Sequence, residues 1–127
     1  NRYEEKELLE SSLRYGNVIC NRYKYSNLVY STTSGLDPMW IAGLDQYMPD
    51  ADLVIVIDIE PQTSFSRKEK RDPLESDLGY LKKVQSEYLE MAGELGWYVV
   101  DGSRPPAEVH RSIVDVVNQK FKWNITL

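Results

Sequence analysis

Apolar positions along the chain follow two patterns, one typical of amphipathic helices and the other typical of buried strands. Helical spacing, together with start and stop signals, predicts helices over residues 2–15, 25–32, 61–70 and 76–95, a further one after Asp37, and a last one starting at Pro105 and Pro106. Continuous short apolar runs predict strands over residues 17–20, 53–58 and 97–100. Because strands alternate with helices, the pattern indicates an α/β fold with a parallel sheet.

The run from Leu53 to Asp58 is the clearest strand, and its continuous apolar character predicts a strand covered on both faces. Ligands of parallel α/β folds bind at the carboxyl ends of strands, so the residues after Cys20, Asp58 and Val100 are the first candidates for a site. The side chains expected in the core are Cys20, Trp40, Ile41, Leu44, Met48, Leu81, Val84, Tyr88, Met91 and Leu95.

The composition of the chain excludes several classes of protein and several kinds of site. A chain of 127 residues with 42% apolar residues is long enough for one domain with a core. A formal net charge of −5 disfavours nucleic-acid binding, which needs a basic face. The single cysteine excludes an internal disulfide and a cysteine-based zinc site. No apolar stretch approaches the ~20 residues of a membrane span and no signal peptide is evident, so we expect a cytoplasmic protein.

Polar and aromatic residues follow the first predicted strand. Arg22 would emerge at the carboxyl end of that strand, where its guanidinium offers a planar fork for a phosphate. On a helix, Asn27 and Tyr30 share a face, and an amide beside a phenol suits a nucleobase and a sugar. An arginine paired with a surface carboxylate and a tyrosine packed in the core would show the same residue types. Spacing alone leaves both interpretations open.

The order of these residues resembles the thymidylate kinase family, which has Asp-Arg-Tyr or Asp-Arg-His after a strand, then a Ser-Asn pair and an aromatic residue. The matching positions, all implied to bind substrate, are Arg22, Tyr23, Ser26, Asn27 and Tyr30. The resemblance implies that Arg22 binds the dTMP phosphate and stabilises charge on the transferring phosphoryl group. It also implies that Asn27 hydrogen-bonds the thymine edge and that Tyr30 packs under the deoxyribose.

Other segments are similar to the same family. The opening Asn-Arg-Tyr-Glu resembles a segment whose arginine donates to a thymine carbonyl, which implies that role for Arg2. The segment Asp101-Gly102-Ser103-Arg104 resembles an Asp-Ala-Ser segment that lies near the adenine of ATP. The resemblance therefore implies that Ser103 and Arg104 contact ATP.

A basic run begins at Arg67, and four of its first five residues are cationic. A charge run of this kind is commonly a solvated helix face. In the resembled family the same place holds the lid that closes over ATP, which implies a lid over about residues 61–76. The resemblance implies that Arg67 stacks on adenine and that Arg67 and Arg71 stabilise charge during transfer.

Two departures from the family pattern affect these expectations. Asn21 stands where the family has an aspartate that helps organise Mg²⁺, and a neutral amide is a weaker ligand for that hard cation. The sequence also lacks the Gly-x-x-x-x-Gly-Lys-Ser/Thr loop whose amides cradle ATP phosphates. We therefore expect an incomplete P-loop-kinase-type domain whose first strands are missing, with roughly 70 further residues ahead of Asn1. We expect this chain alone to be inactive and unstable.

The resemblance implies phosphoryl transfer from ATP to dTMP with Mg²⁺, in a homodimer, since relatives dimerise through helices. One alternative is another nucleoside or nucleotide kinase of the same fold. A noncatalytic nucleotide-binding α/β domain is the other, and Asn21 with the absent phosphate loop is its best support.

Overall fold

The computed structural model describes residues 2–63 and 78–126, with the side chains from Glu4 onward. The chain divides into two compact units, Asn1–Ala51 and Asp52–Leu127, and each is described by itself. The predicted lid lies outside the described residues, apart from a short helical stretch over residues 61–63.

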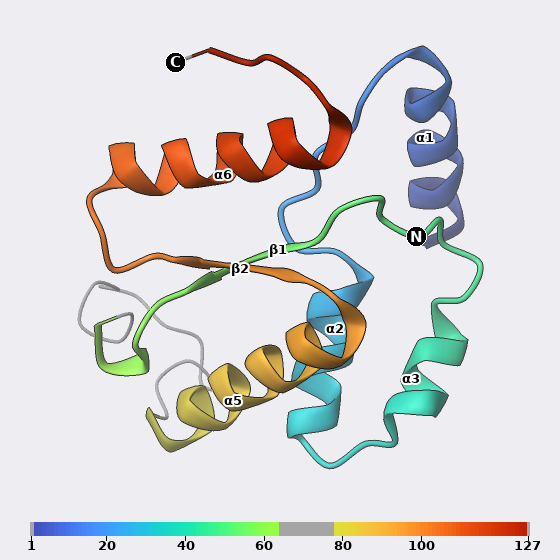
Figure 1. The fold of residues 1–127 in the computed structure, drawn as a ribbon. Coiled ribbons are helices and arrows are strands. Elements are labelled where there is room, and N and C mark those ends of the chain that lie inside the picture. The colour runs from blue at the N-terminus through green and yellow to red at the C-terminus, as the bar shows by residue number, and fades with distance from the viewer. Residues whose placement is uncertain (1, 64–77, 127) are drawn as a thin grey trace. The chain divides into compact units, whose positions relative to one another are not determined.

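The first unit contains three helices, α1 (Arg2–Tyr15), α2 (Lys24–Thr33) and α3 (Pro38–Leu44), as predicted (Figure 1). α3 begins as its sequence indicates, because the Asp37 carboxylate accepts a hydrogen bond from the backbone N–H of Met39 at 3.0 Å. Proline in the first turn of α3 loses no intrahelical hydrogen bond there. Local signals therefore determine where this helix starts.

The core of the first unit lies where α2 packs against α3 and the segment after it. Val29 is fully buried, and Ile41 and Met48 are 4% and 8% exposed. Trp40 and Leu44 were also expected in this core, but they are 58% and 48% exposed. That prediction is wrong because α3 has only seven residues and buries a narrower stripe than the apolar spacing indicated.

Residues 17–20 do not form the predicted strand. They have no regular secondary structure and are exposed, with Ile19 at 98% exposure, and the predicted core thiol Cys20 is exposed as well. A strand exists only when a neighbouring strand accepts and donates its ladder hydrogen bonds. None of the described residues supplies that neighbour, so an apolar run with strand-like composition remains irregular here.

The second unit contains a parallel pair of strands, β1 (Ile55–Asp58) and β2 (Tyr98–Asp101), with Ile57 aligned to Val100. The helices α5 (Leu78–Leu95) and α6 (Pro106–Phe121) lie on opposite faces of this pair (Figure 1). The prediction of an α/β fold with parallel strands is confirmed. The absence of the first strands of a larger sheet remains a prediction.

The core of the second unit is formed by side chains from both helices and from β2. The buried members are Val84, Met91, Ala92, Val100 and Val114. Leu95, expected on the buried stripe of α5, is 56% exposed. Ile57 is 49% exposed, so β1 is not covered on both faces by the described residues.

Gly102 makes a tight backbone approach in this unit. It follows β2, and its N–H donates to the carbonyl oxygen of Asp58 at 2.7 Å. A Cβ at this position would lie 2.6 Å from Ile59 Cγ1 and 2.7 Å from Ile57 Cγ2. Only glycine fits here without displacing the side chains of Ile57, in β1, and Ile59, just after it.

Candidate functional site

A cavity of about 480 Å³ lies within the first unit, a size typical of small-molecule sites. Its lining comes from α1, from α2 with the residues just before it, and from the segment that follows α3. The cavity is lined by Glu5, Leu9, Cys20, Arg22, Tyr23, Lys24, Ser26, Asn27, Tyr30, Asp45 and Met48. Five of these are substrate-binding residues expected from the sequence, so the structure brings that set to one cavity.

Arg22 folds back over α2. Its φ of 59° is left-handed, which is uncommon for a residue with a side chain. This conformation lets Nε donate to Ser26 Oγ at 2.9 Å, and the guanidinium carbon lies 4.8 Å from the ring centroid of Tyr30. Because Nε already donates to Ser26, the two terminal nitrogens of this exposed guanidinium are the groups that can bind an anion bidentately.

Asn27 is held at both ends of its amide. Its Nδ2 donates to Asp45 Oδ2 at 3.2 Å, and its Oδ1 accepts from Ser31 Oγ at 3.3 Å. Asp45 is only 3% exposed. Sequence reasoning missed Asp45, although one signal was present: it lies on the apolar stripe that runs from Ile41 to Met48, four residues after the first and three before the second.

Tyr23 uses its hydroxyl for structure. The hydroxyl donates to the carbonyl oxygen of Pro49 at 2.8 Å, and the ring meets that of Tyr25 edge to face with centroids 6.0 Å apart. Desolvation by burial, with smaller contributions from Cys20, Tyr25 and Asp50, raises the pKa of Tyr23 to about 12. The phenol is therefore protonated at neutral pH, as its donor role requires.

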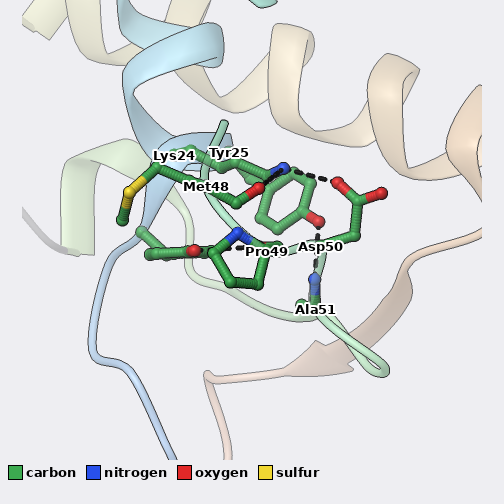
Figure 2. Close-up of polar contacts among 7 residues, drawn as sticks. Lys24, Tyr25, Met48, Pro49, Asp50 and Ala51 are labelled. Atoms are coloured by element: carbon green, nitrogen blue, oxygen red, sulfur yellow. Dashed lines mark hydrogen bonds and ion pairs between the residues drawn. The ribbon is translucent and has the colours of Figure 1, made fainter. Parts of the chain in front are cut away.

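Figure 2 shows how the segment after α3 is tied to the first turn of α2. Lys24 Nζ donates to the Met48 carbonyl at 3.1 Å and forms an ion pair with Asp50. The Tyr25 hydroxyl accepts from the N–H of Ala51 at 2.9 Å (Figure 2). These contacts join pairs of residues that are separated by 24 to 26 positions in the sequence. They place Met48 against the cavity.

The other residues expected at the site lie elsewhere. Arg2 begins α1, and its side chain is not described. Asn21, the position expected near the metal, is exposed beside Arg22. Arg67 and Arg71 lie outside the described residues.

Ser103 and Arg104 belong to the second unit, in the loop between β2 and α6. The hydroxyl and the backbone N–H of Ser103 both donate to Asp101 Oδ1, at 2.6 Å and 2.9 Å, and these hydrogen bonds lower the pKa of Asp101. Arg104 donates from Nη2 to Ser112 Oγ at 2.6 Å. Both side chains are exposed and so are accessible to a ligand.

Two negative findings apply to residues 2–63 and 78–126. No group of three or more His, Cys, Asp or Glu side chains lies close enough together to hold a metal ion. No helix in those ranges has the length and apolar character needed to cross a membrane.

The cavity combines an exposed guanidinium, a fixed amide and aromatic rings. The first can bind a phosphate, the second can read the edge of a base, and the rings can pack against a sugar or a base. Together with parallel strands flanked by helices, this places the chain among α/β proteins with a polar ligand cavity. Residues 1–113 match the family model described as thymidylate kinase, and the chain belongs to that family.

Individual relatives agree with the family match. The chain is 32% identical over 114 residues to a probable thymidylate kinase of Methanocaldococcus jannaschii, covering 89% of this chain and 60% of that protein. It is 36% identical over 103 residues to a probable thymidylate kinase of Archaeoglobus fulgidus, covering 79% and 52%. A thymidylate kinase of Arabidopsis thaliana is 29% identical over 123 residues, covering 96% and 46%. The chain thus spans about half to three-fifths of the length of these relatives.

Proposed function

We propose that the protein transfers the γ-phosphoryl group of ATP to dTMP, giving dTDP for the synthesis of dTTP. Family membership supports the reaction class. The observation that carries the proposal is the presence of Arg22, Asn27 and Tyr30 on the wall of one cavity. These are a phosphate-binding group, a base-reading group and an aromatic ring, so each part of a nucleotide has one candidate contact.

In this proposal the terminal nitrogens of Arg22 bind the dTMP phosphate. The hydrogen bond from Nε to Ser26 and the Tyr30 ring beneath the guanidinium hold the fork in place before the ligand arrives. A dTMP oxygen attacks the γ-phosphorus, the bond to ADP breaks, and the cation offsets charge that builds up on the transferring oxygens. Such catalysis depends on positioning rather than on a covalent nucleophile.

Asn27 reads the thymine edge, with Arg2 donating to a thymine carbonyl, while Tyr30 lies beside the deoxyribose and disfavours a ribose. Tyr23 contributes its ring to the cavity wall while its hydroxyl anchors Pro49. A small number of polar contacts therefore discriminates between nucleotides, and the cavity wall that makes them is mostly formed before the ligand binds.

For the donor nucleotide, we propose that Arg67 stacks on adenine and that Arg71 adds positive charge from the lid. Ser103 and Arg104 would lie near the adenine, and their exposure supports this. Mg²⁺ would supply positive charge that offsets the negative charge of the ATP phosphates. The described residues build no metal cage, and Asn21 offers one neutral oxygen, so phosphate oxygens and water would supply most ligands.

We also propose that the protein is a cytoplasmic homodimer. Exposed apolar side chains gather on and around α3 and support an interface there. They are Leu36, Met39, Trp40 and Leu44, at 46%, 83%, 58% and 48% exposure. Sedimentation of the protein at its full native length should give twice the monomer mass.

An acceptor panel tests the proposed reaction. The protein at its full native length would be assayed with ATP and Mg²⁺ against dTMP, dUMP, CMP and thymidine, and ADP and the phosphorylated product would both be measured. We expect dTMP to be the preferred acceptor. Preference for CMP or thymidine would instead assign another kinase of the same fold. Binding of dTMP without turnover would assign a noncatalytic nucleotide-binding domain.

A further inference from the structure

Asp45 is an acidic side chain in a place where acidic side chains are rarely found. It follows the last residue of α3, is 3% exposed, and contributes to the wall of the cavity. Burying a carboxylate is costly unless polar groups compensate it. One such group is the Asn27 amide, whose Nδ2 donates to Asp45 Oδ2 at 3.2 Å.

This contact determines which way the Asn27 amide faces. Asp45 Oδ2 accepts in this contact, so the NH₂ end of the Asn27 amide lies opposite the carboxyl group. A rotation of the amide by 180° would bring Oδ1 against Oδ2 of Asp45 and set two acceptors facing each other. Ser31 adds no such constraint, because the hydroxyl that donates to Asn27 Oδ1 could equally accept. Asp45 is therefore the group that selects the orientation.

The orientation matters because the amide keeps capacity for a ligand. An asparagine side chain has two donor hydrogens and two acceptor lone pairs, and the contacts with Asp45 and Ser31 use one of each. The remaining donor and acceptor match the edge of thymine or uracil, which presents a carbonyl at C4 and an N–H at N3. Cytosine presents the reverse, an amino group at C4 and an acceptor at N3, and would require the rotated amide.

We propose that Asp45 is a positioning residue that makes the cavity select thymine and uracil over cytosine by holding the Asn27 amide in one orientation. This inference rests on the proposed function, since it assigns specificity to the same nucleotide site. It predicts that selectivity against cytosine depends on a residue that does not itself contact the base.

Asp45→Asn tests the inference directly. The asparagine has nearly the same shape but can donate as well as accept, so the Asn27 amide can take either orientation. For the protein at its full native length, kcat/KM would be measured for dTMP and for dCMP. We expect the dTMP-to-dCMP ratio to fall at least about tenfold, in part through a gain on dCMP. Loss of structure alone would lower both values together and leave the ratio unchanged.

Asp37→Asn is the matched control. It makes the same carboxylate-to-amide change in the same unit, at a residue that caps α3 and does not line the cavity. Asparagine also caps helices well, so stability should be preserved. We expect the wild-type ratio in this variant. An unchanged ratio in Asp45→Asn, with wild-type activity on dTMP, would overturn the inference and leave the proposed function standing.

A measurement on the wild-type protein covers the case in which Asp45→Asn does not fold. In protein labelled with ¹⁵N at asparagine, the Asn27 side-chain amide signals should shift on addition of dTMP and stay in place with the same concentration of dCMP. Equal shifts with both nucleotides would overturn the inference. If wild-type protein neither binds nor phosphorylates dTMP, the proposed function fails, and this inference fails with it.

Discussion

The guanidinium of Arg22 lies 4.8 Å from the ring centroid of Tyr30, eight residues further along the chain. Arg22 precedes α2 and has a left-handed backbone conformation, and its side chain lies along α2. There its Nε also donates to Ser26 Oγ. A cation held this way can meet an anionic ligand with little loss of side-chain entropy on binding.

Replacing Arg22 by alanine should lower kcat/KM for dTMP at least ~100-fold in the protein at its full native length, because the charge that offsets the phosphoryl oxygens is lost. Steady-state kinetics with varied dTMP would measure this. Arg14→Ala, at the exposed last turn of α1, should behave as wild type. A loss of less than about fivefold in Arg22→Ala would remove Arg22 from the site.

Replacing Asn27 by alanine should weaken dTMP binding by roughly 1–3 kcal/mol, since a base contact is lost and the ligand's polar edge is left unpaired. Isothermal titration calorimetry at fixed pH would report the change. Asn17→Ala, at an exposed position outside the cavity, serves as the control. Wild-type affinity in Asn27→Ala would contradict the proposed base contact.

Tyr23 should make stability fall in alkaline solution. Its pKa is about 12 in the folded protein, whereas an unfolded tyrosine titrates near 10. The folded state therefore holds the proton more tightly. Its advantage is complete below pH ~10 and is lost as the pH rises from about 10 toward 12.

Tyr23→Phe should be less stable than wild type at pH 7 by about 1 kcal/mol, through loss of the hydrogen bond to Pro49. Urea denaturation at a series of pH values would show this difference shrinking above pH ~10. Tyr15→Phe, at 89% exposure, makes the same chemical change on the surface and should keep the wild-type stability at pH 7. A constant difference between wild type and Tyr23→Phe across that range would mean that the proton on Tyr23 is not linked to folding.

Two glycine-to-alanine changes should act in opposite directions. Gly102→Ala should destabilise the protein by about 1–3 kcal/mol, because the new Cβ would lie 2.6 Å from Ile59 Cγ1 and 3.1 Å from the carbonyl oxygen of Asp58. Gly93→Ala, exposed within α5 with no described atom beyond its own helical turn within 4 Å of the new Cβ, should stabilise it by roughly 0.5–1 kcal/mol. Thermal melting of both variants would decide; equal shifts would show that the space around Gly102 can relax.

The amino-acid sequence alone determined the features that depend on neighbours along the chain. Asp37 and Pro38 start α3 as predicted, and Gly96 ends α5 with a φ of 74°. Apolar spacing also identified the strands that pair as β1 and β2. Helix capping and amphipathic periodicity depend on residues that are only a few positions apart. Both interacting residues are therefore evident in the sequence. The roles assigned to all the site residues stay predictions.

Tertiary structure alone decided what depends on partners far apart in the sequence. Residues 17–20 read as a strand but lack a ladder neighbour among the described residues, and Cys20 is exposed for the same reason. Asp45 was not recognised because its partner Asn27 lies 18 positions away. Strand pairing and the burial of a polar group are set by which segments meet in space, and the local sequence does not specify that meeting.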